Sequence, residues 1–126
     1  MARLAKATDG LLFSSEADYP LEPFTWTESE PFSPDELYKL TSLPPSTPVA
    51  KESIGDFFAP ALSLGDEPSD ATRQRVARFR TVVRLLRRYF RGLAVYKLGT
   101  VEMPTFIVGR LADGTIAGLR TTVVET

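Results

Sequence analysis

The clearest hydrophobic pattern in the chain is a helical repeat over residues 72–92, "TRQRVARFRTVVRLLRRYFRG". Its apolar side chains return every three or four positions, at Val76, Phe79, Val83, Leu86, Phe90 and Leu93. This spacing places them on one side of an α-helix. Ser69 or Asp70 can cap its start and Gly92 fits its end. We therefore predict one long amphipathic helix over residues 72–92.

Segments rich in β-formers on both sides of this helix predict strands. In "EPFTWTE", residues 22–28, Phe24 and Trp26 alternate with threonines, and Pro23 suits the start of a strand or a sheet edge. After the helix, residues 95–98, 105–111 and 115–124 are strand candidates. Asp113-Gly114 between the last two is typical of a hairpin turn. The sheet should be mainly antiparallel.

Shorter elements complete the predicted fold. Residues 2–8 and 54–58 favour short helices. A third helix should start at Ser33, with Glu36 three residues later forming a capping box. Polar or Pro-rich composition predicts loops over residues 14–20, 41–51 and 63–71. The prediction is an α+β fold over residues 1–126 as a single domain, with one long helix and short helices packed on the sheet.

Composition narrows the function. The chain has 126 residues with no Cys and no His. Cysteine nucleophiles, thiolate metal sites and serine–histidine triads are therefore excluded, and only a carboxylate-based active site would remain. We expect a protein that is not an enzyme. No apolar run approaches a membrane span or a secretory signal, so the cytoplasm is the expected location and no membrane partner is expected.

Charge is divided unevenly between the two halves. Residues 1–70 hold four basic and 13 acidic residues, whereas residues 71–126 hold 11 basic and three acidic ones. Six arginines of the long helix fall on the face opposite the apolar stripe: Arg73, Arg80, Arg84, Arg87, Arg88 and Arg91. This face is either a phosphate-binding stripe, which would make the protein a nucleic-acid-binding module, or a solvated face partly neutralised by the acidic half. The sequence favours the solvated face.

Four carboxylates crowd the early part of the chain: Asp9, Glu16, Asp18 and Glu22. Paired carboxylates could bind Mg²⁺ or act as acid and base, although their spacing matches no calcium loop. Most acidic loops are simply solvated. A third use is to imitate nucleic-acid phosphates and occupy a basic, metal-bearing cleft of another protein.

The end of the chain poses a related choice. In "TTVVET" the β-formers run almost to Thr126, so this segment either completes a sheet or presents its last residue to a partner. Residues 7–26, "ATDGLLFSSEADYPLEPFTW", and residues 95–126 resemble the nuclease A inhibitor family of bacteria. The "DFF" of residues 56–58 fits a short family motif between them.

The resemblance implies a fold, a partner and a site. The fold is an α/β/α sandwich, and the partner is a sugar-non-specific DNA/RNA endonuclease with a catalytic divalent metal. Thr126 would contact that metal, Glu16 would add a contact from the loop, and Glu125 would lie beside them. The resemblance implies a monomer without a cofactor, a metal of its own or direct nucleic-acid binding. Glu16 and Thr126 should be exposed and close together, with Thr126 pointing away from the core.

Overall fold

The computed structural model describes residues 1–126 and is built around a five-stranded sheet in the order β3-β7-β6-β5-β4. Every neighbouring pair in it is antiparallel, and a separate β1–β2 hairpin precedes it in the chain. The strands are β1 (Leu12–Ser14), β2 (Asp18–Pro20), β3 (Glu22–Thr25), β4 (Val49–Glu52), β5 (Arg91–Leu98), β6 (Glu102–Arg110) and β7 (Ile116–Val124). The helices are α1 (Ala2–Thr8), α2 (Ile54–Phe58) and α3 (Asp70–Tyr89), with 3-10 helices η1 (Pro34–Leu40) and η2 (Pro60–Leu62).

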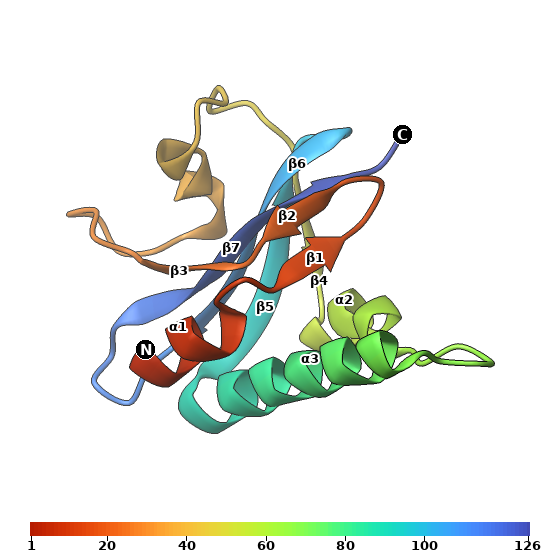
Figure 1. The fold of residues 1–126 in the computed structure, drawn as a ribbon. Coiled ribbons are helices and arrows are strands. Elements are labelled where there is room, and N and C mark those ends of the chain that lie inside the picture. The colour runs from red at the N-terminus through yellow and green to blue at the C-terminus, as the bar shows by residue number, and fades with distance from the viewer.

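The two faces of the sheet have different covers (Figure 1). The helices α1, α2 and α3 and the β1–β2 hairpin lie on one face, where 18 buried residues form the larger core. On the other face η1 packs over a second core of five buried residues: Phe24, Leu37, Leu98, Phe106 and Val108. These layers confirm the predicted α+β class and its mainly antiparallel sheet. The second helical layer consists of η1 alone.

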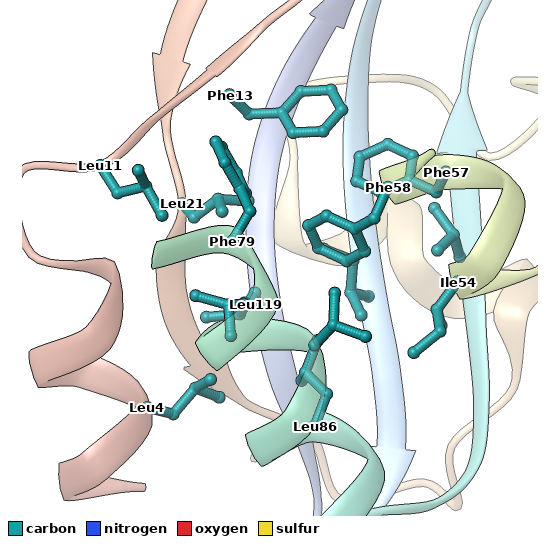
Figure 2. Close-up of a cluster of buried hydrophobic side chains, with 14 of the residues drawn as sticks. Leu4, Leu11, Phe13, Leu21, Ile54, Phe57, Phe58, Phe79, Leu86 and Leu119 are labelled. Carbon is teal, nitrogen blue, oxygen red and sulfur yellow. The ribbon is translucent and has the colours of Figure 1, made fainter. Parts of the chain in front are cut away.

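A group of phenylalanines joins the hairpin to the helices (Figure 2). Phe13 of β1 stacks on Phe57 of α2, with ring centroids 4.4 Å apart and planes at 5°. Phe58 and Phe79 meet Phe13 edge-on, at 6.1 and 6.2 Å. Each such buried ring contributes about 2 kcal/mol of hydrophobic stabilisation. The packing holds β1, and hence the turn that follows it, in a fixed position against α2.

The long helix is shorter than predicted at its C-terminal end. α3 begins at Asp70, where the Ser69 Oγ accepts the Thr72 N–H at 3.1 Å, and it ends at Tyr89. Phe90 has extended backbone angles, and β5 begins at Arg91. The prediction of a helix to residue 92 was wrong because Phe90 and Leu93 enter the same core and so continue the apolar period. Gly92 has φ +64° within an irregular part of β5, rather than at the end of the helix.

Two predicted loops contain strands. β2 lies within residues 14–20, and β4 occupies the end of the expected loop over residues 41–51. β4 has no alternating burial, and its pairing with β5 defines it as a strand. Its sequence therefore carries no local signal for the strand.

The predicted capping box is absent, because the Ser33 side chain makes no cap bond and the segment is a 3-10 helix. The Glu36 carboxylate instead binds Lys39 at 2.8 Å, and Lys39 also binds Glu30 at 3.2 Å. Hydrogen bonds to Glu36 and then Glu30 raise the pKa of Lys39, and the bond from Lys39 lowers the pKa of Glu30. These contacts hold η1 to the segment that precedes it.

The hairpin between β6 and β7 is as predicted. The Thr115 N–H donates to the Asp113 Oδ1 at 2.9 Å, and Gly114 has φ +89°. Hydrogen bonds from Thr115 lower the pKa of Asp113. Further along, Gly118 of β7 lies so close to β6 that a side-chain carbon would collide with the Ile107 carbonyl. No helix combines the length and the apolar character needed to cross a membrane.

Candidate functional site

The last residues of β7 are bound by the turn of the β1–β2 hairpin. The pairing of β3 with β7 reaches only from Thr25↔Ala117 to Glu22↔Arg120, so β7 continues beyond the end of its edge partner. Beyond it, the Val124 N–H donates to the Ser15 Oγ at 3.0 Å, and the Glu16 N–H donates to the Val124 carbonyl at 3.2 Å. The Ser15 hydroxyl also donates to the Ala17 carbonyl at 3.2 Å, which fixes the turn. The hairpin thus holds the end of β7.

Glu16 and Thr126 are directly hydrogen-bonded to each other. The Thr126 N–H donates to Glu16 Oε2 at 2.7 Å, and the Thr126 hydroxyl donates to Glu16 Oε1 at 2.9 Å. Both residues are exposed. One carboxylate therefore orients the backbone and the side chain of Thr126 together. The structure brings together the two residues that the resemblance singled out, but the hydroxyl of Thr126 turns toward Glu16 rather than standing free.

Glu125 faces a different partner. Its N–H donates to the Val101 carbonyl at 2.9 Å, and its carboxylate binds the Lys97 Nζ at 3.2 Å. Lys97 also binds Glu52 at 3.0 Å, and its side chain is 17% exposed. Burial alone would lower the pKa of Lys97, but the hydrogen bonds to Glu52 and Glu125 outweigh burial and raise it. Lys97 therefore stays charged and holds the two carboxylates together.

These groups line one groove of about 490 Å³, which we call the chain-end groove. It lies between the hairpin turn, α2 and the end of β7, with Phe57 and Pro60 as part of its wall. Its charged residues are Glu16, Glu52, Asp56, Lys97 and Glu125. Four carboxylates against one ammonium group make the groove acidic.

Sequence reasoning missed several residues of this groove. Ser15, Glu52, Asp56 and Lys97 come from four different parts of the chain, and no motif spacing links them. One weak signal exists, because Lys97 is the single lysine among the 11 basic residues of positions 71–126. Arginine binds bidentate partners, whereas lysine acts as a compact point charge that fits between two carboxylates.

The other early carboxylates do not join Glu16. The Asp9 carbonyl accepts the Arg78 guanidinium at 2.6 Å near the end of α1, Asp18 lies on β2 and Glu22 lies on β3. No three acidic residues come close enough together to hold a metal ion. The arginines of α3 are exposed, and Arg73 alone among them forms an ion pair, with Asp70 at 3.5 Å.

A family model described as nuclease A inhibitor-like protein matches residues 1–126, the whole chain. The chain belongs to the nuclease A inhibitor-like family. No curated protein matches it. Membership indicates a role in nuclease inhibition and a nuclease as the partner. In this member of the nuclease A inhibitor-like family, the chain-end groove contains all three residues that the resemblance assigns to the contact.

Proposed function

We propose that this protein inhibits a sugar-non-specific DNA/RNA endonuclease by covering the cleft that holds the catalytic divalent metal. Thr126 enters the cleft, Glu16 contacts it from the hairpin turn, and Glu125 lies at its edge. The observation that carries the proposal is the double hydrogen bond between Thr126 and Glu16. It holds an exposed chain end in one conformation without a partner.

The geometry suits an approach to a metal ion. The Thr126 hydroxyl donates its proton to Glu16, so the lone pairs of that oxygen remain available to a cation. Divalent cations such as Mg²⁺ prefer oxygen ligands, and the Thr126 hydroxyl is one. Because Thr126 is already ordered, it loses little conformational entropy on entering a cleft. The metal belongs to the nuclease, and the inhibitor brings oxygen atoms.

Electrostatics supports the same partner. A nuclease cleft binds polyanions and carries positive charge, so an acidic groove beside Thr126 is complementary to it. Such complementarity raises the association rate and disfavours wrong partners. The proposal assigns the protein no catalysis of its own, and the chain lacks His and Cys.

The test is a titration of this protein into a sugar-non-specific endonuclease assay that contains Mg²⁺. We expect nuclease turnover to disappear near a one-to-one ratio. Glu16→Gln keeps the shape of the side chain but removes its charge, and it should weaken inhibition by about 2 kcal/mol, roughly 30-fold. The matched control is Glu22→Gln, an exposed residue of β3 outside the chain-end groove, which should inhibit like the parent.

Two outcomes would count against the proposal. If no such nuclease from the source organism loses activity, the protein is not an inhibitor of this class. If Glu16→Gln and Glu22→Gln inhibit equally well, inhibition does not run through the chain-end groove. Circular dichroism of both variants would separate loss of binding from loss of folding.

A further inference from the structure

The outer surface of α3 carries positive charge that the rest of the molecule does not neutralise. The acidic half of the chain was a candidate for this role, but only Asp70 of that half pairs with an α3 arginine, and the other ion-paired carboxylates of that half bind lysines. Glu30 and Glu36 bind Lys39, and Glu52 binds Lys97. On α3 the Arg73–Asp70 pair joins atoms 3.5 Å apart whose side chains are 61% and 95% exposed. All remaining arginines of the helix lack an acidic partner.

Helix α1 packs along one flank of α3, beside Arg78 and Tyr89. Arg78 donates to the carbonyls of Ala7 at 3.1 Å and Asp9 at 2.6 Å, which fastens α1 against α3. Arg3 donates to the Tyr89 hydroxyl at 3.0 Å, and Lys6 lies on α1 beside it. We call the exposed arginines that α3 and the start of β5 carry away from the core the basic face: Arg80, Arg84, Arg87, Arg88 and Arg91.

The basic face is an arrangement that helix stability does not explain. Arg80, Arg84 and Arg88 follow one another at i, i+4 spacing, where like charges destabilise a helix. Arg87 and Arg88 lie in the last turn and interact favourably with the helix dipole, but Arg80 and Arg84 lie too far from the end to do so. The choice of arginine over lysine also favours bidentate contacts with phosphate groups.

We propose that the basic face binds the backbone of double-stranded nucleic acid without sequence preference. A helix of 20 residues is about 30 Å long, so its arginines can follow a regular, rod-shaped polyanion over several phosphates. A membrane surface fits less well, because the apolar side of α3 is buried in the core and cannot insert into lipid. Single strands also fit less well, because Tyr89 is the only exposed aromatic residue on α3 that could stack a base.

This activity does not depend on the proposed inhibition. Figure 1 shows α3 along the bottom of the molecule and the chain end at the top, so the helix and the end of β7 lie on different sides. Binding of nucleic acid can therefore be measured without a nuclease. Failure of one proposal would leave the other intact.

The experiment is fluorescence anisotropy of a short labelled DNA duplex, titrated with the protein at salt concentrations from about 50 to about 200 mM. We expect the affinity to fall steeply as the salt concentration rises. Each phosphate contact removed should lower the slope of log affinity against log salt concentration by about 0.9. Arg84→Gln should weaken binding roughly fivefold and flatten the slope by about one unit. Arg80→Gln combined with Arg84→Gln should weaken it roughly 20-fold.

The matched control is Lys51→Gln, which removes one positive charge from exposed β4 outside the basic face. It should change the affinity less than about twofold and leave the salt slope unchanged. If Lys51→Gln and Arg84→Gln lose affinity for the duplex equally, the effect depends on total charge and the proposal is overturned. So would absence of duplex binding by the parent at about 50 mM salt. Equally tight, equally Arg84-dependent binding of polyglutamate would assign the face to an acidic protein instead.

Discussion

The chain-end groove and the basic face carry opposite charge and hold it in different ways. In the groove, Glu16 is fixed by two hydrogen bonds to Thr126, and Lys97 lies between two carboxylates. On the basic face, Arg80 and Arg84 extend from α3 into solvent and form no side-chain hydrogen bond or ion pair. The first region presents atoms at set positions, and the second presents charge on exposed side chains that no bond holds in place.

This difference separates two kinds of recognition. Groups that are held in place before binding lose little entropy and discriminate by geometry. Exposed positive charges attract any polyanion and respond strongly to salt. The groove should therefore be more sensitive to single-atom changes than the basic face, and binding at the basic face should depend more steeply on salt. The predictions below test this contrast from the largest expected effect to the smallest.

The largest effect should come from the chain end. Deleting Thr126, or appending Gly-Ser after it, should weaken nuclease inhibition by about 100-fold, because both changes disturb the donors at the centre of the contact. The melting temperature should stay the same, since an exposed terminal residue buries little. Inhibition constants and thermal melts of the two variants provide the measurement.

A third variant identifies the donor atom. Thr126→Val should weaken inhibition strongly if the hydroxyl approaches the metal, and much less if another group does. Thr100→Val is the matched control, because Thr100 is exposed in the turn before β6 and does not line the groove. If all three chain-end variants inhibit like the parent, Thr126 only completes strand β7 and does not contact the nuclease. The chain-end groove and the basic face would then differ in charge only.

A smaller effect should come from Lys97. Lys97→Met leaves Glu52 and Glu125 without their shared cation, which should cost about 1 kcal/mol of stability and weaken inhibition about fivefold. The folded pKa of Lys97 is raised above the unfolded value of about 10.4. Its stabilising contribution is therefore complete below about pH 10 and is lost as pH rises through the folded pKa.

Chemical denaturation at a series of pH values would measure this contribution. The difference in unfolding free energy between parent and Lys97→Met should be constant near neutral pH and shrink in strongly alkaline solution. Lys51→Met serves as the control, because Lys51 has no ion-pair partner. The difference in unfolding free energy between the parent and Lys51→Met should stay near zero at every pH. A difference for Lys97→Met that grows with alkaline pH would show that the groove is held together in some other way.

The smallest effect on inhibition should come from the basic face. Arg84→Glu with Arg88→Glu should leave the inhibition constant within about threefold, because exposed charges outside a contact mainly change encounter rates. The same variant should lose duplex binding. If it stays folded and no longer inhibits, the nuclease contacts α3, and the separation between the two regions is wrong.

The sequence predicted elements whose signals are local. The start of α3, with Ser69 as its cap, and the β6–β7 hairpin around Asp113-Gly114 depend on neighbouring residues alone. β4 was missed because its pairing with β5 defines it, and that partner lies more than 40 positions away. The end of α3 was missed because Phe90 and Leu93 follow the helix but enter the same core. They therefore continue the apolar spacing of the helix beyond its last residue.

The candidate site shows the same limit more strongly. Glu16 and Thr126 were singled out by family resemblance, and no spacing or periodicity in the sequence links them. Lys97 and Glu52 were missed because they meet only after the sheet assembles. Even Ser33 and Glu36, a local pattern, failed when Lys39 provided a stronger partner for Glu36. Local rules fail at positions where a charged group offers a competing bond.

The hydrogen bonds between the hairpin turn and the end of β7 also make the candidate site dependent on folding of the whole chain. They join positions 109 and 110 residues apart, with the whole large sheet between them. Such distant contacts are costly in loop-closure entropy unless the intervening strands hold the two ends together. An unfolded chain therefore lacks the Glu16–Thr126 pair, even though it contains both residues. If the proposed inhibition runs through this pair, inhibition requires a chain that has already folded.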